Sequence, residues 1–257
     1  MTFALQWLDL RAPADDAARD AALIAALADW AAQRTGGEPL RIVDLGAGAG
    51  ATHRALAAHL PGAHWTLVDH DPALLAEAAR RTGARTRQAD LSRDLEDVLA
   101  GADLVAASAF FDLVSAAWLD RFAAALPPGA AVHAALTYDG RETWTPAPPD
   151  DGEAQDAFRA HMRRDKGFGP ALGGDAPAAL AAALGGARRV TAAPSPWILT
   201  EKDRALIEAL SDGAAQAVAE TGALTDARLS GWRAARRMAA RAEIGHCDLL
   251  ALPLADA

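Results

Sequence analysis

Cysteine, lysine and long apolar runs are all scarce in this chain of 257 residues. The single cysteine, Cys247, excludes an internal disulfide and leaves no paired-cysteine spacing for a metal, so a cytoplasmic protein without a metal site is expected. There are only two lysines, and the formal net charge is -9. An acidic chain does not attract nucleic acid or an anionic membrane surface, so the expected partner is a small-molecule substrate.

No apolar run approaches the roughly 20 residues that span a membrane. The first residues carry no basic segment ahead of their apolar positions, so no export signal is expected. The length is ample for a buried core, and we expect a single domain over residues 1–257. An amphipathic helix is expected from Ala14 to Arg34, where Leu23, Leu27 and Trp30 recur at helical spacing.

The most informative stretch is RIVDLGAGAGATHR, residues 41–54. Ile42, Val43 and Leu45 predict a short apolar strand, and a helix is expected from Thr52 to Leu60. The turn between them holds three glycines: Gly46, Gly48 and Gly50. A backbone without Cβ atoms can lie directly against a ligand, and the free N–H groups of a first helical turn favour a carboxylate or phosphate. A nucleotide-like cofactor is the expected occupant.

Polar residues also end the later strands. A strand at 64–69 ends in Asp69, which lies 19 positions after Gly50, where an acid can accept both hydroxyl protons of a ribose. A weak strand over 84–88 is followed by Asp90, and an apolar run at 103–108 ends in Ser108. With a fifth strand at 130–138, strands alternating with helices predict a doubly wound parallel sheet. Ligands bind such sheets at the carboxyl ends of the strands.

These motifs resemble those of the class I S-adenosylmethionine (SAM) methyltransferases. Asp44 stands two places before the first glycine, as in their motif I, and the Val-Asp-x-Asp-Pro sequence around Asp69 resembles their motif II. The resemblance covers about residues 38–140 and implies SAM as the cofactor. It implies cofactor contacts from Asp44, Gly46, Ala47, Gly48, Asp69, His70, Asp90, Leu91 and Ser108. Within that set Asp69 would bind the ribose, Asp90 the adenine amino group, and Leu91 the ring.

The implied fold is α/β, a doubly wound, seven-stranded Rossmann-like sheet that is mostly parallel, with its last strand antiparallel and with helical lid insertions. The expected segments are an N-terminal helical part (1–37), a SAM-binding core (38–140), a substrate lid (141–186) and C-terminal strands and helices (187–257). A sixth strand broken by prolines is expected at 187–199, and a last strand at 246–252. The two helices between them are expected either to join the lid or to form the surface of a homodimer.

The acceptor side is less defined by sequence. Residues 139–151 hold three prolines and are expected to form a loop, followed by a helix over 153–166. Arg159, Arg163 and Lys166 share one side of that helix and favour an acceptor that carries a carboxylate or phosphate. The alternative is a solvated helix face balanced by nearby acids. Phe111 is expected to line the acceptor site, although an aromatic pair is more often core.

Methyl transfer is an in-line displacement, so positioning two reactants supplies much of the acceleration. A base is needed only if the acceptor must lose a proton, and the candidates are His161, Tyr138, Asp112 and His133. Two other functions remain open. Gly46 to Ala51 also fits the Gly-x-Gly-x-x-Ala fingerprint of NAD(P)-binding oxidoreductases, although no Tyr-x-x-x-Lys pair is present. A non-catalytic SAM-binding protein would also retain the glycine loop.

Overall fold

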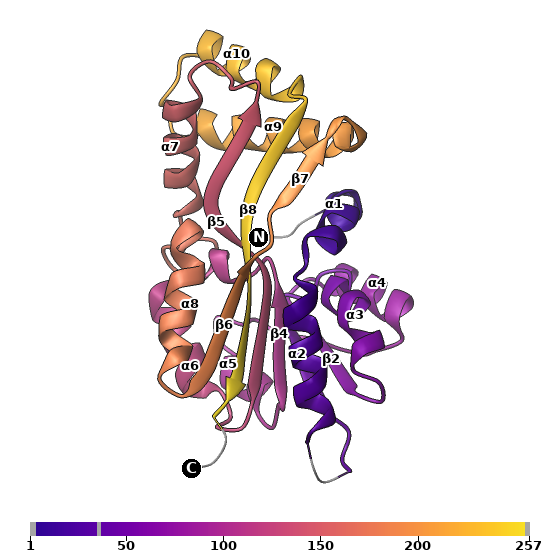
Figure 1. Ribbon diagram of the computed structural model, residues 1–257. Helices are drawn as coiled ribbons and strands as arrows, with labels where there is room; N and C mark the ends of the chain where they lie inside the picture. The colour runs from indigo at the N-terminus through magenta and orange to yellow at the C-terminus, as the bar shows by residue number, and fades with distance from the viewer. Residues whose placement is uncertain (1–3, 35–36, 255–257) are drawn as a thin grey trace.

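The computed structural model describes residues 4–34 and 37–254, and its centre is one eight-stranded sheet (Figure 1). The strand order is β3-β2-β1-β4-β5-β8-β6, and β7 pairs with β8 beside this path. The strands are β1 (Arg41–Leu45), β2 (His64–Asp69), β3 (Arg85–Gln88), β4 (Leu104–Ser108), β5 (Ala131–Thr145), β6 (Arg188–Pro194), β7 (Trp197–Thr200) and β8 (Arg241–Pro253).

Strand directions confirm the expected topology. The pairs that join β1 to β5 are all parallel, whereas β8 is antiparallel to β5, β6 and β7. The expected sheet had seven strands, and the structure has eight because the expected sixth strand at 187–199 is two separate strands, β6 and β7. Pro194 and Pro196 interrupt it because proline has no N–H for the ladder, so β6 pairs with the end of β8 and β7 with its beginning.

Helices cover both faces of the sheet. Apolar side chains of α5, α6 and α8 pack on one face with Val43, Val105 and Val132, and those of α2 and α3 pack on the other with Ile42 and Leu104. The helices are α1 (Leu5–Ala18), α2 (Ala21–Ala32), α3 (Ala51–Leu56), α4 (Pro72–Thr82), α5 (Leu95–Leu99), α6 (Ala116–Ala125), α7 (Asp151–Met162), α8 (Ala176–Gly185), α9 (Arg204–Ala219) and α10 (Asp226–Arg237). Short 3-10 turns are η1 (Ala57–His59), η2 (Phe111–Leu113), η3 (Gly173–Asp175) and η4 (Glu201–Asp203).

The N-terminal part is two helices, so the expected single helix from Ala14 to Arg34 is wrong. Arg19 and Asp20 are extended between α1 and α2, and the Asp20 carboxylate caps α2 by accepting from the Leu23 N–H at 2.8 Å. The α1 helix begins nine residues earlier than that prediction, at Leu5, and packs beside β7 (Figure 1). This placement brings α1 over the carboxyl end of the sheet.

Two strands run far beyond the rest of the sheet. Residues 139–145, expected as loop, continue β5, and β8 starts at Arg241 rather than 246. Pairing of Trp144 with Ala242 extends the ladder, because Trp144 is buried in a second apolar cluster with Trp197 and Leu206. The prolines at 146–149 follow the strand instead of breaking it. Helices α7, α9 and α10 surround this extension (Figure 1).

A buried cation holds α10 on the extension. The Arg236 side chain is 1% exposed and ion-pairs with Glu142 of β5. Its guanidinium lies 3.8 Å from the Trp144 ring centroid and 4.5 Å from that of Trp232. The charge is therefore compensated by one carboxylate and two aromatic faces. Helices α9 and α10 thus join α7 in one packed unit above the sheet.

Candidate functional site

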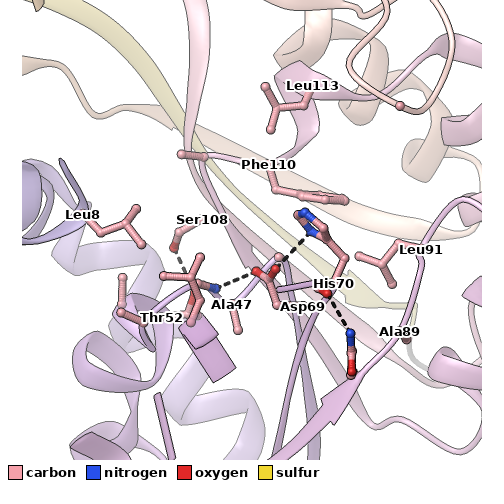
Figure 2. A pocket seen from close by; sticks show the side chains of 18 of the residues that line it. Leu8, Ala47, Thr52, Asp69, His70, Ala89, Leu91, Ser108, Phe110 and Leu113 are labelled. Atoms are coloured by element: carbon pink, nitrogen blue, oxygen red, sulfur yellow. Dashed lines mark hydrogen bonds and ion pairs between the residues drawn. The ribbon is translucent and has the colours of Figure 1, made fainter. Parts of the chain in front are cut away.

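A cavity of about 590 Å³ lies at the carboxyl ends of β1, β2 and β4 (Figure 2). This volume is in the range of ordinary small-ligand sites. Its wall is built from the glycine loop, the ends of β2 and β4, residues 88–94, one side of α1 and residues 166–168. The cavity therefore occupies the edge of the sheet that the sequence predicted.

The glycine loop is held by the carboxylate at the end of β2. Gly48 N–H donates to Asp69 Oδ2 at 2.9 Å, and Asp71 N–H donates to Asp69 Oδ1 at 3.0 Å. His70 Nδ1 lies 3.1 Å from Asp69 Oδ1 (Figure 2). Gly46 and Gly48 have φ of +61° and +52°, and a Cβ on Gly46 would lie 2.7 Å from the Phe110 ring. A larger residue at position 46 would therefore displace the Phe110 ring from the cavity wall.

The second polar group lies beyond β3. Asp90 Oδ1 accepts from the N–H and hydroxyl of Ser92 at 2.9 and 2.6 Å, and Oδ2 lies 3.0 Å from Arg93. These hydrogen bonds, the Ser92 hydroxyl first, hold the pKa of Asp90 below its usual value. Asp90 is thus a fixed carboxylate on the cavity wall, and the buried Leu91 side chain lies beside it. A hydrogen-bond acceptor beside an apolar surface suits a purine ring that carries an amino group.

Hydroxyl groups form the wall between β1 and β4. Thr52 Oγ1 and Ser108 Oγ are 3.0 Å apart, and Arg19 Nη2 donates to Ser108 Oγ at 2.9 Å. Asp44 lies behind these groups and is fully buried, so it does not itself line the cavity. Burial raises the pKa of Asp44 to about 7, against the opposing effects of the Thr52 hydroxyl and the Arg19 charge.

The Asp44 shift predicts a pH-dependent stability. The folded protein keeps this proton up to about pH 7, whereas the unfolded chain releases it near 3.8, so the stabilisation present at low pH is lost as the pH rises between these values. Urea titrations at about pH 5 and pH 8 compare the free energies of unfolding of wild type and Asp44→Asn. The difference between the two proteins should shift by roughly 2–3 kcal/mol in favour of Asp44→Asn between pH 5 and pH 8. Asp29→Asn, at an exposed position on α2, should show no such gain. Parallel pH profiles for wild type and Asp44→Asn would contradict the assignment.

None of the four residues predicted as bases lines the cavity. The Tyr138 hydroxyl donates to Glu142 Oε1 at 3.3 Å, and burial raises its pKa. His133 is completely buried, which lowers its pKa to about 4. His161 Nε2 pairs with Glu220 Oε2 at 2.9 Å, outside the cavity. Asp112 is buried with its pKa raised to about 6 by burial, and only its neighbour Leu113 reaches the cavity.

Only one of the residues predicted to bind the methyl acceptor lines the cavity. Lys166 lines the cavity, but Arg159 and Arg163 pair with Asp156 and Asp175 outside it. Helix α7 ends at Met162, so Lys166 lies in the following loop rather than on the helix as predicted. Phe111 is 1% exposed and packs in the core, while its neighbour Phe110 takes the cavity position.

Sequence reasoning missed the contribution of α1. Leu8, Asp9, Arg11 and Asp15 line the cavity, and Leu8 lies against Gly48. Ion pairs at its two ends, Asp9 with Arg81 and Asp16 with Arg54, join α1 to α4 and α3. Phe168 completes the wall opposite, with its ring 5.7 Å from that of Phe110. The i,i+4 spacing of Arg11 and Asp15 was visible in sequence, but nothing local placed the helix over the cavity.

Comparison with known proteins identifies the type of domain that holds the glycine loop. Residues 43–132 match the model of a methyltransferase domain, which contains the glycine loop, Asp69 and Asp90. No curated protein matches the chain. Together with the sheet order and the strand-end residues, this match shows a Rossmann-like methyltransferase domain over residues 43–132, and SAM is the cofactor that such a domain uses. The match favours SAM over a nicotinamide cofactor as the ligand of the glycine loop and favours an enzyme over a non-catalytic SAM-binding protein.

Solved structures resemble the chain distantly. The plantazolicin methyltransferase BamL, solved with a substrate analogue and S-adenosylhomocysteine (SAH), is 11% identical over 96% of this chain and 88% of its own, with a TM-score of 0.48. YjhP from E. coli is 16% identical over 94% and 99%, with a TM-score of 0.47. The [4+2]-cyclase SpnF is 17% identical over 90% and 82%, with a TM-score of 0.43. These similarities do not identify the acceptor.

Two further features bear on the class of site. Among residues 4–34 and 37–254, no three His, Cys, Asp or Glu side chains are grouped so that they could hold a metal ion. Over the same ranges, no helix combines the length and apolar character needed to cross a bilayer.

Proposed function

We propose that this methyltransferase acts on a small-molecule acceptor that carries a carboxylate or phosphate. The observation that carries the proposal is the shape of the cavity. It extends from Asp90 and Asp69 past Ser108 to a second wall formed by α1, Leu113 and residues 166–168. Aromatic and cationic side chains cover that second wall, so a compact ligand beside the cofactor would be enclosed.

Each part of the cofactor region has a proposed task. Asp69 would accept from the two ribose hydroxyls while it keeps the Gly48 N–H in place, and Asp90 would accept from the adenine amino group. Thr52 and Ser108 offer hydroxyls to the amino-acid end. SAM supplies an activated methyl group on a sulfonium. The protein then accelerates transfer chiefly by holding two reactants in line and by excluding water.

Lys166 supports an anionic acceptor. Burial lowers the pKa of its ammonium group, which indicates that the charge is incompletely solvated. In the part of the chain that the structure describes, Lys166 forms no ion pair, and its only hydrogen bond is to the His161 carbonyl at 3.4 Å. By contrast, Arg54 and Arg81 of the same cavity contact carboxylates. An acceptor carboxylate or phosphate would compensate the Lys166 charge.

Isothermal titration tests the cofactor part of this proposal. Purified protein titrated with SAH should show binding in the micromolar range, and NAD and NADP should show none. Binding of a nicotinamide cofactor without SAH binding would refute the proposed use of the cavity.

Methyl transfer from labelled SAM tests the acceptor part. Candidate acceptors are offered in pairs, each carboxylate or phosphate beside its neutral amide or alcohol. Turnover should favour the anionic member, and Lys166→Gln should reduce that preference by about tenfold, because a charge-assisted contact is lost. An equal preference in wild type and variant would remove Lys166 from acceptor binding.

A further inference from the structure

Arg11 on α1 is a cavity residue with a fixed guanidinium. Its Nε donates to Asp15 Oδ2 at 2.8 Å, one helical turn further on. Asp15 is 2% exposed and also accepts from Trp197 Nε1 at 3.1 Å. The Arg11 guanidinium carbon lies 5.4 Å from the centroid of the Trp197 ring. The side chain is therefore held by one ion pair and one aromatic face before any ligand arrives.

The outer edge of the same guanidinium has no partner. Within the described residues, neither Nη1 nor Nη2 of Arg11 donates a hydrogen bond, although the side chain is only 13% exposed and lines the cavity. Arg81 is a useful contrast. Both of its terminal nitrogens donate to Asp9 and its Nε to Glu77, so it has no edge left for a ligand.

We propose that Arg11 is a carboxylate-binding residue of this cavity, with its Nη1 and Nη2 edge as the binding surface. The planar fork of a guanidinium matches the two oxygens of a carboxylate, and a partly buried pair is weakly screened. Because Asp15 and Trp197 already order the side chain, binding costs little additional conformational entropy. The proposal rests on the proposed function and refines it, since it adds Arg11 to Lys166 as a determinant of ligand charge.

Two carboxylates could occupy this edge: that of the methionine moiety of SAM, or one on the acceptor. A pair of cofactor analogues separates them. SAH contains the amino-acid group and 5′-methylthioadenosine lacks it, while both retain adenine and ribose. Asp69 and Asp90 should serve both ligands equally, so a difference between the two ligands reports on the amino-acid end alone.

The experiment is calorimetric titration of wild type, Arg11→Gln, Arg11→Lys and the control Asp16→Asn with both ligands, because Asp16 lies on α1 but does not line the cavity. If the carboxylate is that of the cofactor, Arg11→Gln should weaken SAH binding at least tenfold and leave 5′-methylthioadenosine binding unchanged. Arg11→Lys keeps the positive charge, so its loss of SAH affinity should be smaller than that of Arg11→Gln. Asp16→Asn removes the ion pair that joins α1 to α3 and should leave SAH binding unchanged. A loss of SAH affinity in Asp16→Asn equal to that in Arg11→Gln would mean that α1 had merely loosened, and would overturn the proposal.

A second arm addresses the acceptor. Protein saturated with SAH is titrated with benzoate and with benzamide, because Phe110 and Phe168 offer ring edges and faces to an aromatic probe. If the carboxylate belongs to the acceptor, wild type should bind benzoate at least tenfold more tightly than benzamide, and Arg11→Gln should abolish the difference. If neither arm depends on Arg11, the proposal is wrong. If wild type fails to bind SAH at all, the proposed function fails instead.

Discussion

Asp69→Ala is expected to weaken SAH binding by at least tenfold, about 1.4 kcal/mol. Two ribose hydroxyls would lose a charged acceptor. The variant would also release the Gly48 N–H, which donates to Asp69 at 2.9 Å and fixes the glycine loop below the ligand. The first loss acts on the bound state and the second on the free loop that receives the ligand, so isothermal titration with SAH measures their combined effect on affinity.

Asp69→Asn is the matched variant. It keeps the side-chain volume and one oxygen that can accept from the Gly48 N–H, but it loses the negative charge and part of the capacity to accept from two hydroxyls. Its loss of affinity should be smaller than that of Asp69→Ala. Circular dichroism should show both variants folded. An Asp69→Ala protein with a native spectrum and wild-type affinity would exclude Asp69 from the site.

Arg236→Ala should cause the largest loss of stability, about 3–5 kcal/mol in the free energy of unfolding. The substitution leaves Glu142, 6% exposed, as an unpaired buried carboxylate, and it opens a space between the Trp144 and Trp232 rings. Breaking one partner of a buried pair costs more than the pair contributes, because the remaining charge has no solvent. Urea denaturation followed by tryptophan fluorescence measures the change.

Arg233→Ala is the control on the same helix. Arg233 pairs with Asp212 at the surface, with side-chain exposures of 49% and 39%, so its removal should cost at most about 1 kcal/mol. A similar loss of unfolding free energy in the two arginine variants would show that the burial of Arg236 does not increase its contribution to stability. Because Arg236 does not line the cavity, folded Arg236→Ala should retain SAH binding.

The parallel part of the sheet was predictable because its signals are local. A short apolar strand, a helix and a polar residue at the strand end recur along residues 41–108, and each unit can be recognised without knowing its neighbours. The extension of β5 was not predictable in this way. Residues 141–145 alternate in burial only because Trp144 meets β8, which begins almost a hundred residues later, and the prolines after it suggested a loop.

The site, too, has a part that local sequence signals predict and a part that they do not. Gly46, Gly48, Asp69, Asp90 and Ser108 follow strand ends, so the topology alone brings them to one edge of the sheet. The wall opposite depends on tertiary packing. Arg11 faces a space that is also bordered by Phe110 and Phe168, and no sequence spacing connects these residues. Arg159 and Arg163 had the right chemistry, but they lie outside the cavity because nearby acids hold them at the surface.

The long ribbon of β5 and β8 has a mechanical consequence. It runs from the parallel sheet into the unit formed by α7, α9 and α10, and its pairing resumes after each of two register shifts, at 134–137 and 138–142 (Figure 1). Because strands on both sides of these shifts are paired, a large movement of that unit would require breaking strand pairing. Adaptation to a new acceptor therefore falls to individual side chains on α1 and residues 166–168, which can be exchanged without disturbing any strand register.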